Sequence, residues 1–210
     1  MKRTIAKGQV PVLKNLVAQA ALIKAAATLL VEEAGSEIST RRRIAASIGV
    51  LESNGDCLVR ENAALFAANP PSIFSCSYEP EHLRALTSHL DDILDAIEEA
   101  AFRLSAYQWA WLVPGIPRSC VCLKTCAEGI CSAIQGMVDH SDLPTDCLDI
   151  PLVARRGDML LRESVRELFS SDGEALTIFT NKEICETLRQ ALSFCKAAIQ
   201  QLLILESSSV

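Results

Sequence analysis

The feature that most constrains the fold of this chain is an internal repeat. The stretch LESNGDCLVRE begins at residue 51, and VARRGDMLLRE begins at residue 153, a displacement of 102 positions. A Gly-Asp pair, a leucine and an Arg-Glu pair keep their places in both copies, but Glu52 is replaced by Ala154. A repeat of this kind predicts two structurally similar halves within the 210 residues.

Apolar residues recur at helical spacing along most of the chain. We expect six helices, over about residues 10–35, 38–66, 80–104, 118–138, 148–170 and 182–206. The apolar seam of the third segment, which contains Leu90, returns in the sixth around Leu192, whereas the first and fourth segments align poorly. The predicted fold is therefore all-α, with six helices in two three-helix bundles related by the repeat.

The two bundles are predicted at residues 1–112 and 113–210, as parts of one compact domain. Scarce aromatic residues and abundant alanine and leucine also favour packed helices over a β-sandwich. Gly55 and Gly157 hold the same place in the two halves, although a glycine inside a helix costs roughly 1 kcal/mol relative to alanine. We expect another helix to pass close to each glycine; coincidence is the alternative.

The charge and the N-terminal sequence limit the partners and the location. A net charge of -6 argues against nucleic acid, which requires a basic surface. Lysine and arginine near the N-terminus interrupt any secretory signal, and Lys14 and Lys24 argue against a membrane-spanning helix in the first segment. The expectation is a cytoplasmic protein that is not inserted in the membrane.

Nine cysteines are present, an odd number without a CxxC pair. In a chain without a visible signal sequence they are interpreted as reduced thiols, most of them small core residues. The cluster of Cys120, Cys122, Cys126 and Cys131 does not have the spacing of a standard zinc site, so its role stays open.

Acidic residues form the one pattern with metal-binding chemistry. Glu52 and Asp56 are four residues apart in the second segment, and Asp91, Asp95 and Glu98 share a stripe in the third. Carboxylates on facing helices repel one another unless a positive charge lies between them. Oxygen ligands at this spacing suit iron, manganese, magnesium or zinc.

Two alternatives to a metal site of this kind remain. The acids can be solvated and paired with bases such as Arg60 and Arg103. A ferritin-like di-iron site requires Glu-x-x-His on two helices, and the sequence has this spacing only from Glu79 to His82.

The acidic segments carry a resemblance to a known family. LESNGDCLVRE together with EHLRALTSHLDDILDAIEEAAFRL resembles the PhoU-like phosphate transport regulators, specifically distant PhoU homologues encoded beside Pit-type phosphate permeases. The similarity continues in GDMLLRESVRELF and NKEICETLRQAL, so it spans most of the chain.

The resemblance implies metal clusters bound through paired acidic motifs, one pair per bundle. Carried over to this chain, the metal ligands are Glu52, Asp56, Asp91 and Asp95, with Glu98 as a further candidate. The metal would be iron, zinc or another divalent or trivalent ion.

The second bundle lacks most of these ligands. Ala154, Ser193 and Ala197 occupy the positions of Glu52, Asp91 and Asp95, so only Asp158 remains, with Arg155 and Arg156 beside it. We therefore expect any metal to lie in the first bundle alone.

The resemblance implies a cytoplasmic regulator or accessory protein of inorganic phosphate transport. Its partner would be a Pit-type phosphate permease at the cytoplasmic face of the membrane, and a homo-oligomer is also compatible with the sequence. No catalysis is expected, because the chain has no Gly-rich phosphate loop and no Ser-His-Asp order. The alternatives are a metal-dependent hydrolase or oxidase built on the carboxylates, and a purely structural helical interaction module.

Overall fold

The protein is all-α, as its periodicity predicts. The computed structural model describes residues 9–68, 78–107, 111–139, 144–170 and 173–207. The helices are α1 (Val10–Ala34), α2 (Ile38–Ala68), α3 (Pro80–Ala106), α4 (Gly115–Val138), α5 (Ile150–Ser170) and α6 (Ala175–Ser207), with a short 3-10 helix η2 (Thr145–Asp149) before α5. No strand occurs in the described ranges.

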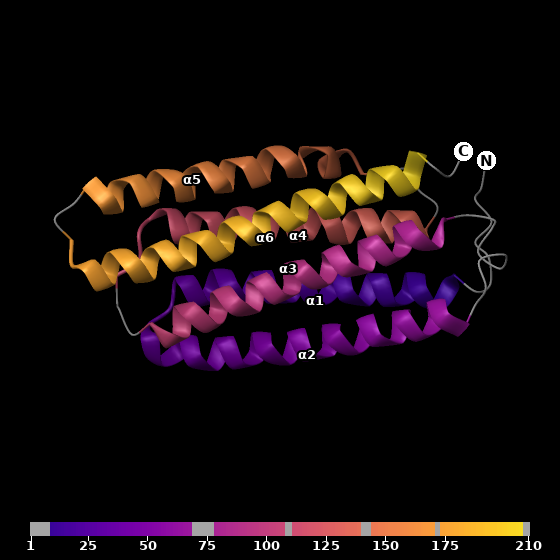
Figure 1. The fold of residues 1–210 in the computed structure, drawn as a ribbon, viewed down its shortest axis with the longest axis horizontal. Coiled ribbons are helices and arrows are strands. Elements are labelled where there is room, and N and C mark those ends of the chain that lie inside the picture. The colour runs from indigo at the N-terminus through magenta and orange to yellow at the C-terminus, as the bar shows by residue number, and fades with distance from the viewer. Residues whose placement is uncertain (1–8, 69–77, 108–110, 140–143, 171–172, 208–210) are drawn as a thin grey trace.

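The six helices form two three-helix bundles that lie side by side (Figure 1). In the first bundle α1, α2 and α3 contact one another, and α4, α5 and α6 do the same in the second. The bundles meet through α1 against α4 and through α3 against α6, which leaves α2 and α5 on opposite outer edges. Buried residues of both bundles belong to a single hydrophobic core.

Residues related by the internal repeat occupy equivalent positions in the two bundles. Leu90 of α3 and Leu192 of α6 are both fully buried. The repeat also extends to α1 and α4, where the sequences align poorly. Ala20 and Ala27 are buried like Leu123 and Ile130 of α4, which lie 103 positions further on. Alanine in one copy is matched by a large residue in the other, which hides the correspondence from the sequence.

Gly55 and Gly157 lie where a neighbouring helix approaches closely. A Cβ at Gly55 would lie 2.6 Å from Cδ2 of Leu94, and one at Gly157 would lie 2.7 Å from Cδ1 of Leu192. These leucines are on α3 and α6, so each glycine faces the third helix of its own bundle. The predicted close approach is confirmed at both positions.

By length and composition, α1 is the described helix that could cross a membrane. In this fold α1 contacts α2, α3 and α4. Leu16 and Leu30 are fully buried, whereas Lys14 and Lys24 are exposed. Its apolar composition is that of a core helix with one solvent-facing side.

Candidate functional site

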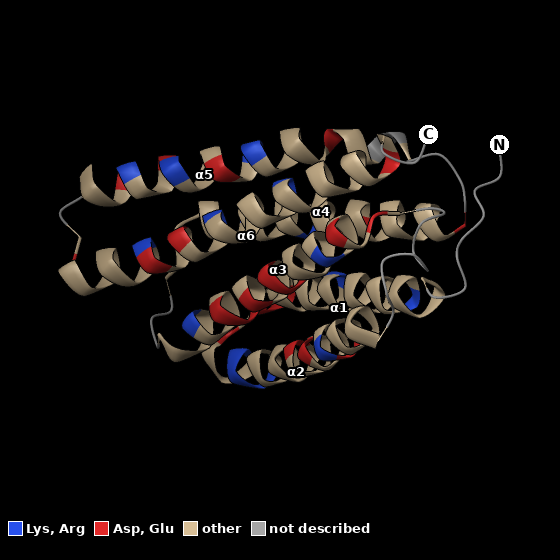
Figure 2. Cartoon of the chain, turned by 45° about the vertical axis from the view of Figure 1, so that its right-hand side comes forward, with Lys and Arg blue, Asp and Glu red and all other residues tan. Residues whose placement is uncertain are grey.

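The five predicted acidic ligands lie on the two helices that the sequence predicts, and these helices are neighbours. Glu52 and Asp56 project from α2, and Asp91, Asp95 and Glu98 project from α3. Figure 2 shows acidic residues along α3 and α2 in the first bundle. We call these five residues the acid cluster.

Electrostatics indicate that members of the acid cluster interact across the helix pair. The pKa of Asp91 is raised to about 6, first by burial and then by the charges of neighbouring carboxylates, among them Asp95, Asp56 and Glu52. Burial also raises the pKa of Asp95 and of Glu98, and in both cases the charge of Glu52 on α2 adds to the increase. Each shift is caused first by burial and then by neighbouring carboxylates, so both causes disfavour the negative charge of these residues.

Basic residues compensate the acid cluster only weakly. Nη1 of Arg60 lies 3.8 Å from Oδ2 of Asp56, but their side chains are 69% and 47% exposed. Exposed pairs of this kind contribute little stability. Arg103, the other base considered, pairs instead with Glu99 of α3 and with Glu183 of α6, the latter at 3.0 Å. Of the acid cluster, Asp56 pairs with one of these two bases, and Asp95 is exposed to solvent.

In the second bundle the equivalent acid is neutralised by arginine. Asp158 accepts hydrogen bonds from Nε of Arg162 and from Nε of Arg189, both at 2.7 Å. Burial acts to raise the pKa of Asp158, but the two arginine hydrogen bonds outweigh burial and lower it. The pKa of Asp158 thus shifts in the opposite direction to the pKa values of Asp91, Asp95 and Glu98.

Sequence reasoning missed Arg189, which connects α6 to Asp158 of α5. Arg155 and Arg156, the expected source of positive charge, are exposed. The sequence does contain a signal for this residue. The repeat aligns Arg189 with the uncharged Thr87 of the first bundle, so the second bundle has an additional positive charge at this position. Ala154, at the position of Glu52, is fully buried. The second bundle therefore has a packed and neutralised face where the first has the acid cluster.

The chemistry of the acid cluster suits a hard metal ion, but its geometry is not that of a formed coordination shell. Its donors are all carboxylate oxygens, the ligands that such ions prefer. Among the described residues, no three His, Cys, Asp or Glu side chains are placed to hold a metal ion. Binding would therefore require side-chain rotation on α2 and α3.

The ferritin-like alternative has no support in the described residues. Nε2 of His82 lies 3.5 Å from Oε2 of Glu79 at the start of α3, outside the acid cluster. His89 lies close to Asp92, also on α3, with Nδ1 3.7 Å from Oδ2. Both contacts are local to one helix.

Most of the described cysteines are core residues, as expected. Cys120 and Cys126 on α4 are fully buried, and burial raises the pKa of Cys120 to about 12. The Cys147 thiol donates to the backbone oxygen of Gly129 at 3.2 Å. Such thiols stay protonated at neutral pH and pack as small apolar groups.

The fold is shared with solved PhoU-like proteins. A PhoU-like phosphate regulatory protein from Shewanella oneidensis MR-1 superposes with a TM-score of 0.73 at 16% identity, over 94% of this chain and 99% of that protein. A second PhoU-like protein from the same organism gives a TM-score of 0.74 at 16% identity, over 93% and 99% of the two chains. The resemblance seen in the sequence is thus confirmed for the fold.

Sequence comparison finds a distant curated relative. UPF0111 protein YkaA from Bacillus subtilis (strain 168) is 24% identical over 131 residues, which are 61% of this chain. The match spans 64% of the length of that protein. No protein-family model matches the chain.

Proposed function

We propose that this protein is a PhoU-like regulator or accessory protein of inorganic phosphate transport. The supporting observation is its two-bundle fold, which matches solved PhoU-like proteins over nearly the whole chain, one of them described as a phosphate regulatory protein. The proposed partner is a Pit-type phosphate permease, contacted from the cytoplasmic side without insertion into the membrane.

We propose that the protein has no catalytic activity of its own. A hydrolase or oxidase would need a metal held in place together with a nucleophile or a base beside it. The acid cluster lies on an open helix face. The fully buried thiols of α4, such as Cys120, belong to the other bundle and are separated from the acid cluster. Regulation through binding needs neither feature.

The acid cluster is proposed to bind a divalent or trivalent metal such as iron or zinc. Glu52 and Asp56 would supply ligands from α2, and Asp91, Asp95 and Glu98 from α3. The support is electrostatic: the pKa values of Asp91, Asp95 and Glu98 are all raised, so a cation would relieve repulsion among these residues. Such a metal would also tie α2 to α3.

The transport role is tested in the source cell. Deletion of the gene should change the rate of phosphate uptake, and the wild-type gene should restore it. The permease should co-purify with the tagged protein from solubilised membranes. Uptake that does not depend on the gene would contradict the proposal, and release of phosphate from phosphoesters by the metal-loaded protein would favour the hydrolase.

A further inference from the structure

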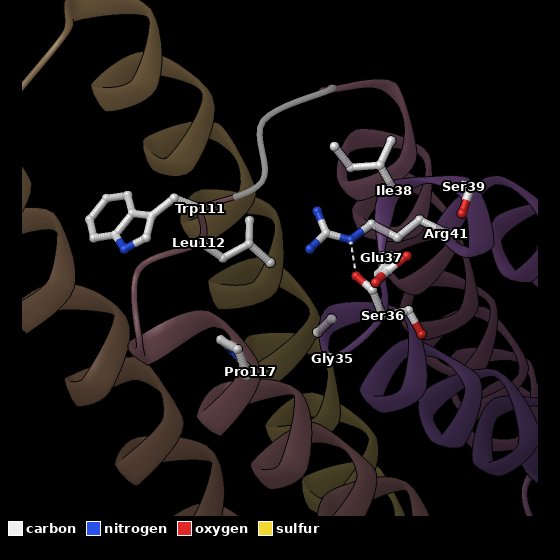
Figure 3. A pocket seen from close by; sticks show the side chains of 10 residues that line it. Gly35, Ser36, Glu37, Ile38, Ser39, Arg41, Trp111, Leu112 and Pro117 are labelled. Atoms are coloured by element: carbon white, nitrogen blue, oxygen red, sulfur yellow. Dashed lines mark hydrogen bonds between the residues drawn. The ribbon is translucent and has the colours of Figure 1, made fainter.

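The cavity of about 620 Å³ at the corner of α1 and α2 does not present its charges to a ligand. Nε of Arg41 donates to the backbone oxygen of Ser36 at 3.0 Å, and its unpartnered Nη1 is buried. Figure 3 shows the indole of Trp111 pointing away from Arg41, and the exposed Glu37 adds negative charge to the lining. The outer face of α5 carries a clearer recognition pattern.

This face alternates arginine with large apolar side chains. Starting just before α5, a row advances by alternate steps of four and three residues, which keeps its members on one side of a helix. We call this row the α5 stripe; it consists of Leu148, Leu152, Arg155, Met159, Arg162, Arg166 and Phe169. All seven residues are exposed, and the four apolar ones are between 59% and 68% exposed. The opposite side of α5 is buried through residues such as Ala154 and Leu161.

The internal repeat supplies a comparison for the α5 stripe. The equivalent positions on the outer side of α2 are also exposed; they are Ala46, Val50, Ser53, Cys57, Arg60, Ala64 and Ala67. Each apolar member of the α5 stripe is larger than its counterpart, and two of its three arginines replace Ser53 and Ala64. Because α2 and α5 occupy equivalent outer edges, the packing of the bundles does not require this difference.

Positive charge predominates on the outer face of α5. Arg156 lies exposed beside the stripe, so this face has four arginines, and Glu163 is an exposed acid among them. Arg162 pairs with Asp158, whereas the other three arginines make no ion pair with a described residue. Figure 2 shows basic residues repeated along α5.

The acid cluster lies far from this basic face. Its residues belong to α2 and α3 of the first bundle, and α2 and α5 are on opposite outer edges of the molecule (Figure 1). An anionic surface can therefore approach α5 without approaching the acid cluster, although the chain carries a net charge of -6.

The chemistry of the α5 stripe matches an anionic lipid surface. Arginines are attracted to anionic head groups, and exposed apolar side chains between them can enter the boundary with the acyl chains. A nucleic acid would match the charge but offers no apolar layer to these side chains. A second copy packed through the same stripe would place arginine against arginine. A convex helix at the edge of the molecule also suits a fluid surface, whose head groups can rearrange around each arginine.

We propose that the outer face of α5 lies on the surface of an anionic bilayer. The arginines contact the head groups, and the apolar members of the α5 stripe enter the boundary with the acyl chains. The contact is peripheral, with no helix spanning the membrane. It is made directly to lipid, so the proposal does not depend on the role in phosphate transport or on a permease.

The test is co-sedimentation of the purified full-length protein with lipid vesicles. We expect binding to vesicles of phosphatidylglycerol and phosphatidylcholine, weakened by added salt, and no binding to vesicles of phosphatidylcholine alone. The double variant Arg155→Gln and Arg166→Gln should weaken binding at least about tenfold, because two attractions to anionic head groups are lost. The double variant Arg42→Gln and Arg43→Gln makes the same charge change at exposed positions of α2 and should leave binding unchanged.

A second pair of substitutions tests the apolar part of the contact. Leu152→Ser with Met159→Ser leaves every charge in place and should also weaken binding to the mixed vesicles, by at least about tenfold. Both positions are exposed, so the fold is retained, which circular dichroism checks. Absence of binding to the mixed vesicles would overturn the proposal and point to an acidic protein partner. Equal binding to phosphatidylcholine alone, or equal loss in the α2 double variant, would also overturn it.

Discussion

At the scale of the residue, one repeated aspartate has opposite surroundings in the two bundles. Asp158 accepts two arginine hydrogen bonds, whereas Asp56 has one exposed arginine and contributes to the raised pKa of Asp91. The decisive difference is Arg189, which occupies the place of Thr87. The charge that a bound cation would supply in the first bundle is supplied by arginine in the second.

The first prediction compares Asp56→Ala with Asp158→Ala. Elemental analysis should show metal loss in Asp56→Ala alone, because only the first bundle has several carboxylates together. Melting temperature alone does not discriminate, since Asp158→Ala leaves Arg162 and Arg189 unpaired and should cost about 1 kcal/mol. Equal metal content in Asp56→Ala and wild type would contradict the metal proposal, and metal loss in Asp158→Ala would place a site in the second bundle.

The second prediction concerns the buried acid Glu33. Its pKa rises from 4.5 to about 8 on folding, so the folded state favours the protonated form. This contribution to stability is fully present below pH 4.5 and is lost as the pH rises toward about 8. Glu33→Gln should abolish that loss, so the variant gains stability over the wild type as pH increases, by on the order of a few kcal/mol.

Chemical denaturation at a series of pH values measures the effect. The two proteins should be similar in stability near pH 4.5 and diverge toward pH 8. Glu32→Gln is a suitable control, because Glu32 is the exposed neighbour of Glu33 on α1. A constant difference between Glu33→Gln and wild type at all pH values would show that Glu33 is not protonated by burial.

At the scale of the element, the helices were predictable because each carries a continuous apolar seam. Five of the six begin within about three residues of their expected start. The exception is α6, which starts at Ala175 and not near residue 182. The additional turns include Asn181, whose side chain holds the segment before α4. These contacts of Asn181 are made in the tertiary structure, so the local sequence gives no signal that α6 starts earlier.

The third prediction uses the glycines within helices. Gly157→Ala should destabilise the protein by about 1 kcal/mol or more, because its Cβ would meet Leu192 at 2.7 Å and Cys122 at 3.2 Å inside the core. Gly49→Ala in α2 is the matched control, since no atom lies within 4 Å of its added Cβ. It should stabilise by up to about 1 kcal/mol through helix propensity. Urea denaturation of both variants is the measurement, and stabilisation by Gly157→Ala would contradict the close approach.

At the scale of the whole molecule, the repeat predicts two bundles but not how they meet. The contact of α3 with α6 and the cavity beside Arg41 each join segments that are far apart in sequence. Five acidic candidates could be placed on α2 and α3 from their spacing alone. The role of Glu33 could not be predicted, because its burial depends on packing between helices. Arg189 could be singled out only through its alignment with Thr87 in the repeat, and its pairing with Asp158 depends on the same packing.

The last prediction is that the two bundles unfold together. They share one core, and Arg103 of α3 bridges to Glu183 of α6 with both side chains less than a quarter exposed. Separating them would expose the apolar faces of α1, α3, α4 and α6 at once.

Calorimetry of the full chain should therefore give one transition whose calorimetric and van't Hoff enthalpies agree. Arg103→Ala should lower its midpoint without splitting it, because the bridge is one contact in an apolar interface. A fragment of residues 1–112 should lack a cooperative transition, since its α1 and α3 surfaces have lost their partners. Two transitions in the full chain, one of them retained by the fragment, would instead show that the predicted halves are independent domains.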